Sequence, residues 1–159
     1  MSGIVGEVER NNGIISALPF AMLKMGSQQS VTAGSMTKVA FDEMYGGSYG
    51  SVSSDGWLVP ENGMYKVDLQ VQSHSTSNNV TDLYLHVKLD STTKHGGYMV
   101  QIGGERHVTG QCTGMFRATA GQIIYGYAQT TGTSPMFYHD AGTSYGRDTC
   151  CMVITFLGK

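Results

Sequence analysis

The chain has 159 residues and a formal net charge of −2, with no long run of like charges. This length suits one domain with a full hydrophobic core, and the charge excludes the basic surface of a non-specific nucleic-acid-binding protein. No apolar stretch approaches the ~18 residues of a membrane span. Glycine is abundant at 22 residues, proline is scarce at 3, and 14% of residues are charged. This glycine-punctuated sequence, rich in Thr, Ser, Val and Tyr, predicts an all-β, antiparallel two-sheet sandwich.

Residues 1–30 show no persistent helix or strand period. Short aliphatic clusters are separated by Gly6, Asn11 to Gly13 and Pro19. The segment is too aliphatic for a solvated tail, so we expect an irregular docking arm covered by another protein; the alternative is a disordered terminus. The expected buried contacts are Ile4, Val5, Ile14, Ile15, Leu18, Phe20 and Leu23. Glu7 and Glu9 stand where a secretory signal would be positive, which favours synthesis in a cytoplasm.

A long central strand is predicted within Trp57 to Gln72. Pro60 and Asn62-Gly63 form the turn that leads into it, since proline presets φ and Asn-Gly supplies positive φ. Beyond the turn, apolar and polar residues alternate strictly. This period of two predicts a half-buried strand, with four residues pointing into the core: Tyr65, Val67, Leu69 and Val71.

The remaining strands are predicted from weaker patterns on either side. Residues 31–45 alternate loosely and predict a first long strand, and 46–56 and 73–79 read as polar loops. A turn is expected at 91–97 and a tight connection at Gly103-Gly104. The other expected strands are 83–89, 98–102, 110–117, 123–129 and 148–157. The total is about eight strands, as a jelly roll requires.

Two of these strands are apolar on both faces: Ile123 to Ala128, and Cys150 to Leu157. One face of an antiparallel sandwich normally meets water, so a second cover is expected over each. The cover could be a loop or the arm. The sharper interpretation is a subunit interface, for which the candidate residues are Ile124, Gly126, Ala128, Cys151, Val153 and Leu157.

A catalytic site is not indicated. The five histidines form no His-x-x-x-His pair, and no Gly-x-Ser-x-Gly, P-loop or dinucleotide fingerprint occurs. Cys112 and the adjacent Cys150 and Cys151 do not make a disulfide framework, because neighbours in a strand point to opposite faces. We therefore expect no enzyme activity, no metal and no cofactor.

The one plausible ligand site is the long loop over 130–147, which combines aromatic side chains with polar acceptors. The equally weighted alternative is a loop folded onto its own aromatic residues. The candidate ligand-binding residues are Phe137, Tyr138, His139, Asp140, Tyr145 and Arg147.

Four segments carry a family resemblance. The Pro60 turn followed by Gly-x-Tyr, the Val39 to Asp42 strand, the Ala120 to Tyr125 strand and the terminal Cys150 to Leu157 strand occur in a distinctive order. Together they make residues 31–159 resemble the globular head of complement component one-q and the tumour-necrosis-factor-like jelly rolls. The resemblance implies a homotrimer. The expected final Ser-x-Phe-x-Gly pattern is absent, with Met152 and Ile154 nearby.

Secreted members of that family follow a signal peptide and often a collagen-like stalk, and neither pattern occurs here. The Ser-Gly-Ile start also resembles the leader of some phage virion proteins. The leading hypothesis is a non-enzymatic phage structural protein: a trimer made in the host cytoplasm and carried on the virion, where it decorates or cements the capsid through an arm bound to the major capsid protein. The alternatives are the glycan-recognising tip of a tail or head fibre, and a lectin-like module unrelated to viruses.

Overall fold

The computed structural model describes residues 18–77, 79–105, 107–138 and 150–159. For residues 98–105 it describes the backbone alone. These residues form strands and connecting turns, with no helix of the length and apolarity needed to cross a membrane. The strands are β1 (Phe20–Lys24), β2 (Gln29–Ser30), β3 (Thr37–Lys38), β4 (Glu43–Gly47), β5 (Ser51–Ser53), β6 (Gly56–Leu58), β7 (Gly63–His74), β8 (Val80–Leu89), β9 (Thr92–Glu105), β10 (His107–Ala118), β11 (Ile123–Thr130), β12 (Met136–Phe137) and β13 (Cys151–Gly158).

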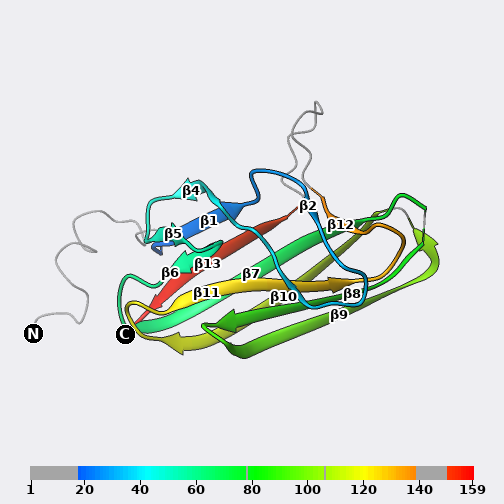
Figure 1. The fold of residues 1–159 in the computed structure, drawn as a ribbon. Coiled ribbons are helices and arrows are strands. Elements are labelled where there is room, and N and C mark those ends of the chain that lie inside the picture. Colours follow the sequence, from blue (N-terminus) through cyan, green and yellow to red (C-terminus); the bar gives the residue numbers. More distant parts are fainter. Residues whose placement is uncertain (1–17, 78, 106, 139–149) are drawn as a thin grey trace, which may run out of the picture.

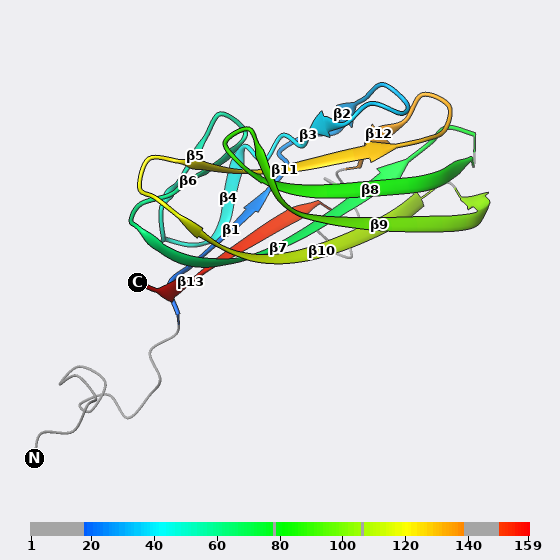
Figure 2. The ribbon, with the colours of Figure 1, turned by 90° about the horizontal axis from the view of Figure 1, so that it is seen from below.

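The strands make two antiparallel sheets that pack face to face (Figures 1 and 2). The larger sheet has the order β2-β12-β7-β13-β1-β4, with β10 on the other side of β7. The smaller sheet has the order β5-β6-β11-β8-β9, with β3 also paired to β11. The predicted all-β, two-sheet jelly-roll sandwich is confirmed.

The central strand β7 sets the register of the larger sheet. It pairs with β10 along its whole length, from Gly63↔Ala118 to His74↔His107, and with β13 through Cys151↔Gln70. The four residues predicted to point inward are all at most 1% exposed. The alternation therefore identified the buried face correctly. A shift of one residue in the pairing would have turned all four side chains to solvent.

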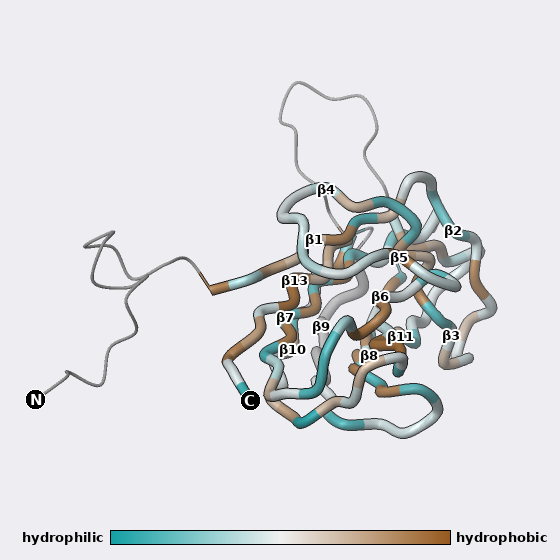
Figure 3. The backbone as a smooth tube through the Cα atoms, turned by 90° about the vertical axis from the view of Figure 1, so that its left-hand side faces the viewer, coloured by the Kyte–Doolittle hydropathy of each residue, from teal (hydrophilic) through white to brown (hydrophobic). Residues whose placement is uncertain are grey.

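The smaller sheet supplies the other half of the core. Leu83, Leu85 and Val87 of β8 are buried, as are Ile124 and Ala128 of β11. Seen from the end of the sandwich, hydrophobic stretches lie on strands of both sheets, including β7 and β11 (Figure 3). The two apolar faces together exclude water from a single core.

An aromatic cluster closes the core near the C-terminus. The ring of Tyr65 lies 5.5 Å from Trp57 and 5.2 Å from Phe156, and Tyr49 stacks on the same group. The Tyr65 hydroxyl donates to the Glu61 carbonyl oxygen at 2.7 Å, and the Tyr49 hydroxyl donates to the Glu61 carboxylate at 2.9 Å. Burial raises the pKa of both tyrosines, so the hydroxyls remain protonated donors.

Strands β9 and β10, the edge strands of the two sheets, approach closely at glycines. A Cβ atom on Gly97 would lie 2.8 Å from the Cβ of Cys112, and one on Gly114 would lie 2.7 Å from the Cβ of His95. Both distances are shorter than real carbon contacts, so this approach requires glycine at both positions.

Several predicted boundaries are wrong. Residues 20–24, assigned to the arm, form β1 between β13 and β4, so the sandwich begins near residue 20 rather than 31. The single strand expected over 31–45 is replaced by β3 and β4. The β8–β9 hairpin turns at Asp90 and Ser91, so the turn expected at 91–97 is mostly strand: residues 92–97 lie within β9, as does the connection expected at 103–104.

Candidate functional site: an interaction surface on the larger sheet

The outer face of the larger sheet collects exposed hydrophobic side chains. Phe20 of β1 is 40% exposed, Tyr45 of β4 57%, Met115 of β10 67% and Leu157 of β13 38%; Leu18, just before β1, is 49% exposed. Among the side chains that the structure describes, these are all of the large hydrophobics that are exposed. Single exposed apolar residues are ordinary, but four on one sheet and a fifth just before its strand β1 mark a candidate contact surface.

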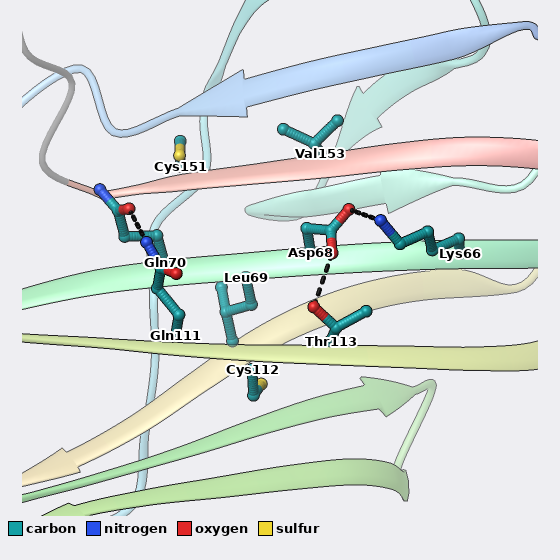
Figure 4. Close-up of a pocket in the computed structure, with 9 residues that line it drawn as sticks. All are labelled: Lys66, Asp68, Leu69, Gln70, Gln111, Cys112, Thr113, Cys151 and Val153. Carbon is teal, nitrogen blue, oxygen red and sulfur yellow. Dashed lines mark hydrogen bonds and ion pairs between the residues drawn. The ribbon is translucent and has the colours of Figure 1, made fainter.

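A shallow hollow of about 310 Å³ lies across β13, β7 and β10 on this face. Its floor is polar (Figure 4): Asp68 accepts hydrogen bonds from Lys66 at 2.8 Å and Thr113 at 2.6 Å, and Gln111 donates to Gln70 at 2.5 Å. The pairs Thr113–Asp68 and Gln111–Gln70 link β10 to the adjacent β7, and Lys66–Asp68 lies within β7. The hollow therefore offers a pre-ordered polar centre with hydrophobic side chains on the strands around it.

The surroundings of Asp68 in the hollow favour the charged form of its carboxyl group. Burial raises the pKa of Asp68, but hydrogen bonds from Lys66 and Thr113 lower it more, and the net pKa lies below its usual value. Cys112 points from β10 into the core, where burial and the nearby Asp68 charge raise its pKa to about 11. Cys112 is thus a neutral thiol and Asp68 an anion at neutral pH.

A second hollow, of about 270 Å³, lies where the chain enters β1. It is lined by Leu18, Pro19, Phe20, Gly47, Ser48 and Tyr49. Gly47 has φ of 74°, and a Cβ there would lie 2.1 Å from the Phe20 carbonyl oxygen. Only glycine fits, because both the backbone angle and the space exclude a side chain.

The predicted interface residues divide between the two faces. Cys151 and Val153 are half-buried on the outer face of β13, and Leu157 is exposed beside them. Ile124 and Ala128 are fully buried within one chain, and Gly126 faces Phe41 and Leu69. The prediction that these three β11 residues line an interface is wrong.

The outward residues of β11 are instead Ile123, Tyr125 and Tyr127. A strand that is apolar on both sides carries no signal for which side is inward.

The predicted docking residues also divide. Leu18 and Phe20 are exposed. Leu23 is fully buried in β1, so its assignment as a docking contact is wrong: it pairs with Met152 and packs in the core. The predictions for Ile4, Val5, Ile14 and Ile15 lie outside the described residues.

The predicted ligand loop is only partly described. Phe137 is fully buried in β12 and cannot contact a ligand at the surface. Tyr138 is half-buried, with its ring 5.5 Å from His74 and 5.1 Å from His107. His139, Asp140, Tyr145 and Arg147 lie outside the described residues.

Sequence reasoning missed Tyr45 and Met115. Met115 was detectable, because it is the apolar member of an otherwise polar outward row, Gln111, Thr113, Met115 and Arg117. Tyr45 had no such signal, because it came last in the loosely alternating strand predicted over 31–45, whereas it lies within β4.

The described residues contain no group of three or more His, Cys, Asp or Glu side chains placed to hold a metal ion. What the surface has is apolar side chains for burial and hydrogen-bonding groups for orientation. That combination is suited to contact with a macromolecule.

The fold is that of a tumour-necrosis-factor-like jelly roll. Among solved structures, the chain is similar to Eiger TNF from S. frugiperda, with a TM-score of 0.60 and 10% sequence identity over 90% of this chain and 94% of that chain. At this identity the likeness defines the fold alone. No model of a protein family and no curated protein sequence matches the chain.

Proposed function

We propose that this chain is a non-enzymatic structural protein that assembles with copies of itself through the outer face of its larger sheet. The observation that carries the proposal is the gathering of the exposed hydrophobic side chains on that one face, around the polar hollow. Burying such residues in an interface removes apolar surface from water at about 25 cal/mol per Å². The polar floor would then fix the register of the copies.

The assembly that we propose is a closed homotrimer. Three copies related by a three-fold axis use heterologous contacts, in which one patch meets a different patch of the next copy. Met115, on the outer edge strand β10, and the hollow between β13 and β10 are two such patches on one chain. The trimeric state itself is carried over from the family resemblance of the sequence.

The trimer is further proposed to decorate a phage capsid, with residues before β1 as the attachment. Leu18 is exposed where the chain enters the sandwich, and it lines the second hollow. A single arm contributes little binding free energy, because ordering each of its residues on the capsid costs about 1–2 kcal/mol. Three arms on one trimer raise the effective concentration of the later contacts, which adds factors of roughly 10²–10⁴.

The self-association is tested by Met115→Lys, with Ile123→Lys as the matched control on the smaller sheet. Met115 is 67% exposed in the single chain, so the substitution leaves the core intact. A charge forced into an apolar interface without a partner is costly. By light scattering, the unmodified protein and the control should be trimers and the Met115 variant monomeric. A monomeric unmodified protein contradicts the proposal, as does a trimer that survives Met115→Lys.

Attachment is tested by removing residues 1–17, which leaves β1 in place. The truncated protein should remain a trimer but no longer co-sediment with capsids that lack this protein, whereas the full chain should bind them. Attachment through apolar burial should also persist at moderate salt. Continued binding of the truncated trimer would assign attachment to the sandwich, and failure of the full chain to bind would refute capsid decoration.

A further inference from the structure

The outer face of the smaller sheet carries a tyrosine pair flanked by two lysines. Tyr125 and Tyr127 project from β11 with ring centroids 6.3 Å apart, in an edge-to-face arrangement. Lys38 of β3 places its Nζ 5.3 Å from the centre of the Tyr125 ring, and Lys88 of β8 places its Nζ 4.0 Å from that of Tyr127. The strands that hold these lysines pair with opposite sides of β11, so a cation lies on each side of the tyrosine pair.

Two glycines on neighbouring strands make room for side chains of this face. A Cβ on Gly56 of β6 would lie 2.6 Å from Cδ1 of Tyr125. A Cβ on Gly96 of β9 would lie 3.0 Å from Cδ2 of His86, which pairs across from Tyr127 on β8. The rings thus lie over positions without side chains, and the face presents aromatic surface across adjacent strands.

The two lysines of this face differ in what they contact within the chain. Lys38 is paired with Asp55 at 3.0 Å and donates to the Ser54 carbonyl oxygen. Lys88 is different: its interaction among the described residues is the Tyr127 ring, with no carboxylate within ion-pair distance. A ring contact leaves the ammonium donors of Lys88 able to bind an anion.

We propose that this face binds an anionic sugar, one that bears a carboxylate or a sulfate group. Tyrosine rings offer flat surface to the C–H groups of a sugar ring, their hydroxyls hydrogen-bond to sugar oxygens, and the Lys88 ammonium complements the anionic group. This binding does not depend on the proposed self-association, because the face belongs to the opposite sheet.

An acidic peptide suits the face less well. Extended peptides gain affinity by adding a strand to a free sheet edge. Here β11 is paired with β8 on one side and with β6 and β3 on the other, so its backbone is already used. The face therefore offers only side chains to a ligand. A flat, hydroxyl-rich sugar can bind through side chains alone, whereas an extended peptide cannot add a strand here.

The test is calorimetric titration of the full chain with two pairs of probes. One pair is sialyllactose and lactose, which differ in a carboxylate; the other is a heparin hexasaccharide and its desulfated form. At least one anionic sugar should bind, its neutral counterpart should bind weakly or not at all, and salt should weaken the binding. Binding of sialyllactose would identify a carboxylate as the recognised group, and binding of the heparin hexasaccharide would identify a sulfate.

Three variants decide whether the bound sugar uses this face. Lys88→Gln and Tyr127→Ala should each weaken binding by roughly tenfold, as the loss of one charged or aromatic contact does. Lys159→Gln removes the same charge from the C-terminus, near Glu61, and should bind like the unmodified protein. Unchanged thermal unfolding of the variants assigns the loss to the face rather than to folding.

Other outcomes overturn the proposal. The proposal fails if neither anionic sugar binds. It also fails if Lys159→Gln weakens binding as much as Lys88→Gln does, or if Lys88→Gln binds as tightly as the unmodified protein. Polyglutamate that binds as tightly as the sugars would show that the face recognises acidic peptide instead.

Discussion

Replacing Gly126 with alanine tests whether the face of β11 that carries Gly126 points into the core. Gly126 pairs with Val87 in the middle of the smaller sheet. A Cβ there would lie 2.6 Å from Cε2 of Phe41 and 2.8 Å from Cδ1 of Leu69, and both of these side chains are at most 1% exposed. Since neither can move into solvent, the added methyl group must displace packed core atoms.

The magnitude follows from two opposing effects. Overpacking a core costs about 1–3 kcal/mol. Gly-to-Ala replacement also restricts the unfolded chain, which stabilises the fold by about 0.4–1 kcal/mol. The free energy of unfolding of Gly126→Ala should therefore fall by roughly 0.5–2.5 kcal/mol. With a urea m value of about 2 kcal/mol/M, this corresponds to a midpoint lower by roughly 0.25–1.25 M.

The assay is urea denaturation of all proteins at one concentration, because self-association makes the midpoint depend on concentration. Gly46→Ala is the matched control: its Cβ would lie 3.7 Å from the Cβ of Met22, an ordinary contact. The control should unfold at the original midpoint or slightly above it. If Gly126→Ala unfolds like the unmodified protein but loses its oligomeric state, Gly126 belongs to an interface and the inward assignment is refuted.

Three other changes probe the core and its hydrogen bonds. Leu69→Ala should lower the free energy of unfolding by about 2–5 kcal/mol in the same assay, and a loss below ~1 kcal/mol would contradict its place in the core. Tyr65→Phe leaves the Glu61 carbonyl without its phenolic donor and should cost about 1–2 kcal/mol, whereas Tyr127→Phe should be nearly neutral. The hydrogen bonds from Lys159 and Tyr49 lower the pKa of Glu61, so its stabilising effect is present above its ordinary value of 4.5 and is lost as the pH falls through the lowered pKa. The melting temperature of Glu61→Gln should thus fall less than that of the unmodified protein on acidification, and parallel curves would contradict this role.

The two strands with strict alternation were predictable, and the two with apolar residues on both sides were predictable only in part. In β7, polar Lys66, Asp68 and Gln70 alternate with the buried residues. Because one face is apolar and the other polar, the sequence itself indicates which face is buried. In β11, Ile124 and Tyr125 are both compatible with a core. The choice between them depended on Phe41 and Leu69, which are distant in the sequence.

Long-range pairing also explains the misplaced boundaries. β1 is only five residues long, and its strand state comes from pairing with β13 at the other end of the chain, as in Leu23↔Met152. Gly96 and Gly97 suggested a turn because glycine is typical of turns. In the structure they lie in β9, where a Cβ on Gly97 would lie 2.8 Å from that of Cys112 and one on Gly96 would crowd the His86 ring at 3.0 Å. Glycine marks close approach as well as chain reversal, and the local sequence does not distinguish the two.

The candidate surfaces could be foreseen only where a residue broke a local pattern. Met115 interrupts a polar row and was visible in principle. The partnership of Lys88 with Tyr127 was not, because it depends on how β8 and β11 align side by side.

The pairing of β1 with β13 has a practical consequence for engineering. The Phe156 amide donates to the Pro19 carbonyl oxygen at 2.9 Å, so the start of the sandwich and the end of the chain lie on adjacent strands, about 5 Å apart in the sheet. A linker of a few residues from Lys159 to Pro19 would close the domain into a ring. New ends could then be opened at Asp90, in the exposed β8–β9 hairpin at the far edge of the smaller sheet. Such a circular permutant would turn two strands from opposite ends of the sequence into one continuous hairpin, converting the most distant pairing of the fold into a local one.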